Sequence, residues 1–162
     1  MRKSLVTIVT IAFFLLLTSA YSTTPADGRV GYKAPNISLS NRYASLSTGA
    51  LKGEYVLITF WSTANPESRI SNMRYDRICK AAQGRIRHLS VNLDRSSGVC
   101  ALASRLDGLQ PSSVFHFGGG DERDRLEEQW RLDGGDSCKS FLIDPSGKIV
   151  AANPLPGQLQ RI

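Results

Sequence analysis

The chain has 162 residues, of which 41% are hydrophobic and 21% are charged, and a formal net charge of +6. Its length suits one domain that builds its own core without disulfide or metal staples. The basic residues are spread along the sequence and form no runs, so we expect a solvated basic surface and no nucleic-acid partner.

Residues 1–22 have the pattern of a secretory signal peptide. A basic start precedes an apolar or threonine stretch from Leu5 to Leu17, which is short for a membrane span. Small residues follow, with cleavage expected after Ala20 or Ser22, and no cysteine lies nearby for lipid attachment. We therefore expect a periplasmic or secreted protein. The alternative is an uncleaved N-terminal anchor, and this segment is the only part of the chain expected to contact a membrane.

A polar linker at residues 23–29 leads into the predicted domain at residues 30–153. The domain begins with a loop and a short strand within residues 30–39, and residues 44–46 are expected to pair with that strand. Residues 55–61 (YVLITFW) form a continuous run of β-branched and aromatic residues. Such a run is typical of a strand buried on both faces, as in a parallel sheet.

Two helices flank the next predicted strand, residues 88–93 (HLSVNL). The first helix is predicted at residues 66–83, and the second ends at Gly108. Apolar residues at helical spacing define the face that each helix is expected to bury. They are Ile70, Met73, Ile78 and Ala81 in the first helix, and Val99, Leu102, Ala103 and Leu106 in the second.

The last part of the domain predicts a brief strand at residues 114–117, a helix at 121–132 and strands at 141–143 and 148–152. The turn D-P-S-G joins the last two strands into a hairpin. The tail at residues 154–162 is expected to wrap over the surface or fray. The alternation of strands and helices predicts an α/β fold, with a central sheet, helices on both faces and an antiparallel edge.

Four strings in this order resemble exported thioredoxin-like proteins of the type that serves cytochrome c maturation and periplasmic reduction. They are V-G-Y-K-A-P at 30–35, K-G-E-Y-V-L-I-T-F-W at 52–61, S-V-N-L-D at 90–94 and F-L-I-D-P-S-G-K-I at 141–149. The resemblance implies a thioredoxin-like fold, in which helices flank a central mixed sheet and a β-hairpin is added at the N-terminus.

The chain departs from this family where the family's chemistry takes place. The family reads F-W-A-x-W-C-x-x-C-R where residues 60–69 read F-W-S-T-A-N-P-E-S-R, so Asn65 and Ser68 stand in place of the two cysteines. An amide forms no anionic nucleophile, and a hydroxyl neither forms nor resolves a mixed disulfide. Asn65, Pro66 and Glu67 instead suit an N-cap, a first helical position and a first turn, so we interpret the segment as a capped helix start.

A second landmark of the family is also missing. The resemblance implies a cis-proline just before the F-L-I-D strand, where it shapes the groove that docks a substrate's cysteine peptide. Cys138 holds that position here. Its presence predicts that substrate docking of the family kind is lost together with the cysteine pair.

Three cysteines, Cys79, Cys100 and Cys138, are an odd number for an oxidising compartment. Cys138 is either a lone reactive thiol beside the Asn65 helix start, an apolar filler or one half of a disulfide. A Cys100–Cys138 bond is compatible with the topology. A Cys79–Cys100 bond is not expected, because the resemblance places their helices on opposite faces of the sheet.

These observations lead to three hypotheses about function. The first is a redox-inactive binding or scaffold module with a protein partner that the sequence does not identify. The second is a thiol–disulfide oxidoreductase or antioxidant-type protein that uses Cys138, alone or paired with Cys100. The third is a hydrolytic or transfer activity at Glu67, which requires a pocket beside that carboxyl. No cofactor is expected, and no metal-ligand spacing is present.

Overall fold

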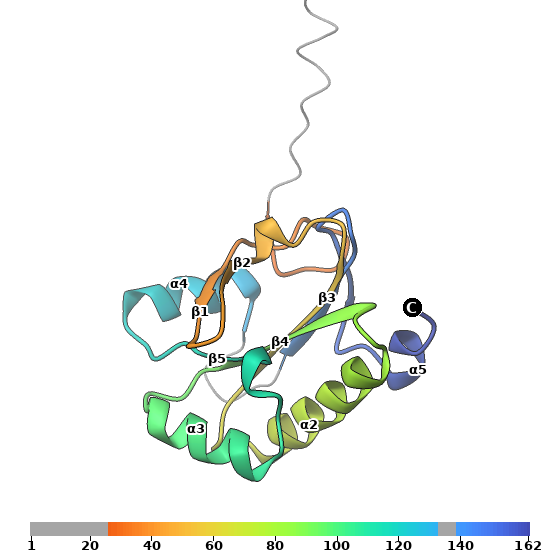
Figure 1. Cartoon of the computed structure of the whole chain (residues 1–162). Helices are drawn as coiled ribbons and strands as arrows, with labels where there is room; N and C mark the ends of the chain where they lie inside the picture. The colour runs from red at the N-terminus through yellow and green to blue at the C-terminus, as the bar shows by residue number, and fades with distance from the viewer. Residues whose placement is uncertain (1–25, 133–138) are drawn as a thin grey trace, which may run out of the picture.

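The computed structural model describes residues 26–132 and 139–162 (Figure 1). The expectations for the signal segment and for Cys138 therefore lie outside the described residues. Within these two ranges, no helix combines the length and the apolar character that a membrane span needs.

The core is a five-stranded mixed sheet with the strand order β5-β4-β3-β6-β7. β3 pairs in parallel with β4 and antiparallel with β6, while β5 and β7 form the two edges. The strands are β3 (Tyr55–Trp61), β4 (Ile86–Asn92), β5 (Val114–His116), β6 (Lys139–Ile143) and β7 (Ile149–Ala152). The predicted mixed sheet is confirmed, and its central strand has the predicted bounds.

A separate antiparallel hairpin precedes the sheet, as expected. It consists of β1 (Ser38–Ser40) and β2 (Ser45–Ser47) and is followed by the 3-10 helix η1 (Thr48–Ala50). The other helices are α2 (Pro66–Ala81), α3 (Ser97–Leu106), the 3-10 turn η2 (Pro111–Ser113), α4 (Asp121–Trp130) and α5 (Pro156–Leu159).

The period-two alternation of β3 divides the core into two layers. Val56, Ile58 and Phe60 face α4 and the hairpin, where the rings of Phe60 and Trp130 lie 5.2 Å apart. Leu57 faces the other way, into a cluster with residues of α2 and α5. Each face of β3 thus buries its own set of side chains, as the continuous run of large residues predicts.

The tail after β7 folds back onto α2 and does not fray. Its α5 buries Leu159 to 1% exposure, and Tyr75 of α2 donates a hydrogen bond to the Pro154 carbonyl at 3.0 Å. Figure 1 shows α5 beside the C-terminal end of α2. The segment therefore completes the packing on that face.

The predicted buried faces of α2 and α3 are only partly confirmed: Ala103 is buried, and Met73 and Ile78 pack against the core, but the other apolar residues do not. Ile70 of α2 is 52% exposed, and Val99, Leu102 and Leu106 of α3 are 46%, 50% and 72% exposed. α2 instead buries a largely polar set, namely Ser68, Asn72, Tyr75, Asp76 and Cys79. The cause is the sheet beneath it, which presents polar side chains to that helix, as described below.

The expected placement of α2 and α3 on opposite faces of the sheet is also wrong. Arg69 of α2 forms a two-pronged ion pair with Asp107, the residue after α3, and Lys80 of α2 donates to the Gly108 carbonyl at 3.3 Å. Met73 of α2 packs against the small cluster that contains Cys100 of α3. The two helices lie side by side in Figure 1, yet Cys79 and Cys100 are both free thiols.

Candidate functional site

The start of α2 is a fully formed helix cap. Asn65 is extended, with φ −108° and ψ 102°, and its Oδ1 accepts a hydrogen bond from the Ser68 amide at 2.9 Å. Pro66 occupies the first helical position, and Glu67 is an acidic residue in the first turn. The capped helix start predicted from the sequence is therefore present.

Ser68 lies beneath this cap and is completely buried. Its hydroxyl is within hydrogen-bond distance of the carbonyls of Asn65 (2.8 Å) and Ser62 (2.9 Å), and it accepts from the Ser62 amide at 3.2 Å. The side chain thus ties the loop that leaves β3 to the first turn of α2. It holds the backbone at the point where the family resemblance places the second cysteine.

Asp94, the second residue after β4, braces the same loop from the side. Its carboxylate accepts from Ser62 Oγ at 2.8 Å, from the Thr63 amide at 3.1 Å and from Asn92 Nδ2 at 2.9 Å. Partial burial alone raises the pKa of Asp94, but these hydrogen bonds together outweigh it and leave the pKa below its usual range. The His116 ring also contacts the Asp94 carbonyl at 2.8 Å.

Glu67 has no site around it. Its side chain is exposed, and it lines none of three cavities described among residues 26–132 and 139–162. A general acid or base needs a reacting group held within hydrogen-bond reach. The hydrolytic or transfer hypothesis at Glu67 therefore has no support from the geometry.

Both described cysteines are buried thiols. Burial raises the pKa of Cys79 to about 12, with a further contribution from the nearby Asp76 carboxylate. Burial also raises the pKa of Cys100, more than its contact with Ser104 lowers it. These are the surroundings of unreactive thiols. Cys138 lies outside the described residues.

A row of hydroxyl groups crosses the face of the sheet that α2 covers. Thr59 of β3 lies in register with Ser90 of β4 on one side and Ser140 of β6 on the other. Ser140 Oγ donates to Thr59 Oγ1 at 3.3 Å, and Asn72 of α2 donates to Ser90 Oγ at 2.9 Å. All four side chains are at most 1% exposed.

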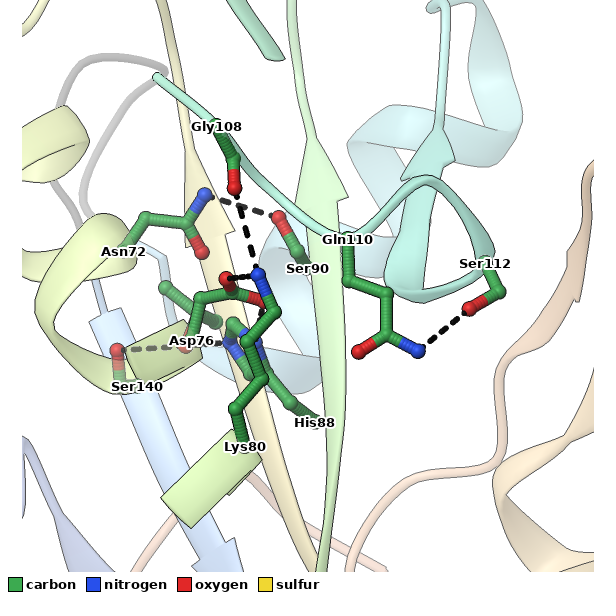
Figure 2. Close-up of polar contacts among 10 residues, drawn as sticks. Asn72, Asp76, Lys80, His88, Ser90, Gly108, Gln110, Ser112 and Ser140 are labelled. Atoms are coloured by element: carbon green, nitrogen blue, oxygen red, sulfur yellow. Dashed lines mark hydrogen bonds and ion pairs between the residues drawn. The ribbon is translucent and has the colours of Figure 1, made fainter. Parts of the chain in front are cut away.

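His88 of β4 continues this row toward the surface (Figure 2). Its Nε2 lies 3.2 Å from Thr59 Oγ1, and its Nδ1 lies 3.7 Å from Asp76 Oδ1. Asp76 Oδ2 in turn forms an ion pair with Lys80 at 2.6 Å. Burial raises the pKa of Asp76, but His88 and Lys80 together hold it below its usual range.

A cavity of about 480 Å³ opens next to this network. Asp76, Cys79 and Lys80 of α2 line it together with His88 and its neighbours on β4, the η2 turn and the tip of the hairpin. Sequence analysis missed this place entirely. The available signal is the polar alternation of His88, Ser90 and Asn92 along β4, which by itself predicts only a strand.

The structure does not gather the residues singled out from the sequence into one site. Asn65 and Ser68 lie at the start of α2, whereas Cys79 is near its end and lines the cavity. Within the two described ranges, no group of three or more histidine, cysteine, aspartate or glutamate side chains is placed to hold a metal ion.

No protein-family model and no curated protein matches this chain. Solved structures do match. A thioredoxin-like protein from Parabacteroides distasonis is 28% identical, with a TM-score of 0.69 over 84% of this chain and 95% of that one. The thioredoxin domain of a thiol-disulfide oxidoreductase from Bacteroides vulgatus is 24% identical, with a TM-score of 0.69 over 82% of this chain and 94% of that domain.

A third similar structure, from Chlorobium tepidum, is described as a thiol:disulfide interchange protein DsbE. It is 21% identical, with a TM-score of 0.66 over 82% of this chain and 92% of that one. The protein therefore has the thioredoxin-like fold, as the sequence predicts. Its structural neighbours include proteins named as a thiol-disulfide oxidoreductase and a thiol:disulfide interchange protein, in line with the thioredoxin-like resemblance found in the sequence.

Proposed function

We propose that this protein is an exported thioredoxin-fold binding or scaffold module that carries out no dithiol–disulfide exchange. The start of α2 carries the proposal. Asn65 uses its side chain as a helix cap, and the Ser68 hydroxyl is buried and hydrogen-bonded to the loop before the helix. Neither group supplies a thiolate, which is the species that attacks a disulfide.

The described cysteines support the same proposal. A thiol that reacts at neutral pH is partly exposed and has a lowered pKa. Cys79 and Cys100 are 6% and 3% exposed, and burial raises the pKa of both. Export is proposed from the basic and apolar N-terminal segment, in which residues 1–22 have the features of a cleaved signal peptide.

The test is catalysis of insulin-disulfide reduction by dithiothreitol. We expect the mature protein to leave the uncatalysed rate unchanged. A matched control is the double variant Asn65→Cys and Ser68→Cys, which puts a C-x-x-C pair at the helix N-terminus, where the helix dipole lowers a thiol pKa. Acceleration by the double variant alone supports the proposal, whereas acceleration by the unmodified protein overturns it.

A second candidate function is thiol–disulfide exchange at Cys138, alone or with Cys100. The names of the structural neighbours favour it, and so does the position of Cys138 directly before Lys139, which pairs with Phe60 of β3. Mass spectrometry after alkylation, with and without reductant, tests for a Cys100–Cys138 bond. If Cys138→Ser leaves every thiol-dependent behaviour of the protein unchanged, this second function is refuted.

A further inference from the structure

Half of strand β4 has an open edge. β5 pairs with β4 only at residues 90–92, so residues 86–89 have β3 on one side and no strand on the other among the described residues. An uncovered strand edge presents backbone donors and acceptors that another strand can use.

The hydrogen bonds beside this segment define which backbone groups point outward. The Phe117 amide donates to the Asn92 carbonyl on the β5 side, whereas the Leu93 amide donates to Trp61 on the β3 side. Alternate residues of a strand direct their N–H and C=O groups to opposite edges. Ile86 and His88 therefore point the same way as Asn92, and the described chain offers their backbone groups no partner there.

The 480 Å³ cavity forms a groove along this open edge, and residues 86–89 all line the groove. One wall is polar and comes from Lys80 of α2 and from Gln110 and Ser112 around η2; Figure 2 shows Lys80 beside His88 and the Gln110–Ser112 hydrogen bond on the other side of it. The other wall includes Tyr43 and Leu46 of the hairpin. The hollow thus has room beside the strand for a further segment of chain.

The opposite edge of the sheet, strand β7, has backbone partners at its start. The Gly31 amide donates to the Ile149 carbonyl, the Ile149 amide donates to the Tyr32 carbonyl, and Lys33 bridges to Lys148. The N-terminal segment of the domain therefore covers the start of β7, and covering is one way in which proteins protect an edge strand. The open half of β4, by contrast, lies next to a cavity.

We propose that the open edge of β4 binds an extended peptide segment of a partner protein, which adds a strand in line with β5. Backbone hydrogen bonds to Ile86 and His88 supply the pairing, and the two walls select alternate side chains, as in other cases of strand addition. This inference rests on the proposed function as a binding module and names the surface that does the binding.

The walls also determine the chemistry of the partner segment. Two exposed basic side chains line the groove, Lys80 and Arg87, and Arg87 is already paired with Glu54. Arg85, beside the groove, is exposed and forms no ion pair among the described residues, so the rim keeps a small excess of positive charge. Asp76 is buried and already paired with Lys80. A peptide that alternates acidic with apolar residues places carboxylates toward the basic rim and apolar groups toward Tyr43 and Leu46.

Fluorescence anisotropy with a labelled peptide of alternating glutamate and valine, about seven residues long, tests the proposal. We expect saturable binding to the mature protein, at least about tenfold weaker for the same peptide with every backbone nitrogen methylated and for its lysine-for-glutamate counterpart. In amide NMR spectra, the signals of Ile86 and His88 are expected to shift during the titration.

Matched variants test the location of the site. Ser112→Trp fills the groove from an exposed position, and Ser97→Trp adds the same bulk at an exposed position on α3 that lines no described cavity. We expect the first to abolish binding and the second to preserve it. No saturable binding up to about 1 mM peptide, equal binding of the methylated peptide, or equal binding by both variants overturns the proposal.

The result is separate from the test of the proposed function. Insulin reduction by the unmodified protein would overturn the proposal that it carries out no dithiol–disulfide exchange. The affinity of the groove for the peptide would still be measured independently. Conversely, failure of the peptide to bind overturns the β4 site without restoring any thiol activity.

Discussion

His88 Nε2 lies 3.2 Å from Thr59 Oγ1, and both side chains are buried between α2 and the sheet. Ser140 Oγ donates its proton to Thr59 Oγ1, so the threonine hydroxyl proton is free to point at His88 Nε2. The ring proton of a neutral His88 then lies on Nδ1, facing Asp76. Polar groups from three strands and one helix thus meet in the core, although His88 Nδ1 and Asn72 Oδ1 have no hydrogen-bond partner among the described residues.

Thr59→Val is expected to lower the free energy of unfolding by about 1–3 kcal/mol, because it removes the buried partner of His88 Nε2 and of Ser140 Oγ. Urea denaturation measures the change. The double variant Thr59→Val with His88→Leu is the control, since removing both partners relieves the unpaired group. We expect it to cost less than the sum of the single variants, and additive costs would contradict the network.

The same network explains where the sequence was informative and where it misled. The strands were predictable because their apolar runs are buried on the α4 face, as with Ile58 and Phe60. The helix faces were not predictable from apolar spacing. Ile70 is exposed while Asn72 and Asp76 are buried, because the sheet offers α2 hydroxyls and His88. The buried polar pairing depends on register across strands, which no single segment encodes.

The two candidate sites also differ in how far the sequence predicts them. The cap at Asn65 was predictable because an N-cap, a proline and an acid follow one another locally in the sequence. The groove beside β4 arises where β5 stops, and it joins residues from α2, η2 and the hairpin. Such a site depends on where a strand ends and on how segments far apart in the sequence come together. Local sequence patterns therefore do not reveal it.

Asn65→Ala is expected to destabilise the protein by about 1 kcal/mol, because the Ser68 amide loses its capping acceptor. Thermal or urea unfolding measures this loss. Glu67→Gln, at an exposed first-turn position, is the matched control, and we expect it to cost less than about 1 kcal/mol through the helix dipole alone. Equal effects of the two substitutions would argue against the cap as the main role of Asn65.

Asp94 is expected to make stability depend on pH in the acidic range. Because the folded protein holds its pKa below the usual value of about 3.9, the carboxylate contributes stability above that pH. The contribution is lost as the pH falls through the lowered folded pKa. Asp94→Asn is therefore expected to be less stable than the parent at pH 7, with the stability difference narrowing as the pH falls below about 4. A gap that is constant with pH in parallel urea titrations would refute this role.

Arg69 and Arg87 allow a comparison of two bidentate ion pairs. In the Arg69–Asp107 pair the aspartate side chain is only 7% exposed, whereas both partners in Arg87–Glu54 are about half exposed. We expect Arg69→Met to lower the free energy of unfolding by about 1–3 kcal/mol, because a buried carboxylate loses its partner. Arg87→Met is expected to change it by no more than about 1 kcal/mol, and less in high salt. Comparable losses for the two substitutions would show that burial of the carboxylate does not determine how much each ion pair stabilises the protein.

The thiols of Cys79 and Cys100 are expected to resist alkylation in the folded protein. Burial raises the pKa of Cys79 to about 12 and also raises that of Cys100, so few thiolates are present at pH 8, and little of either side chain is exposed. Mass spectrometry after brief iodoacetamide treatment, with and without denaturant, measures the labelling of each residue. We expect both to be labelled only after unfolding. Rapid labelling of either one in the native protein would mean that the helix covering it opens readily, and it would weaken the case against thiol chemistry at that position.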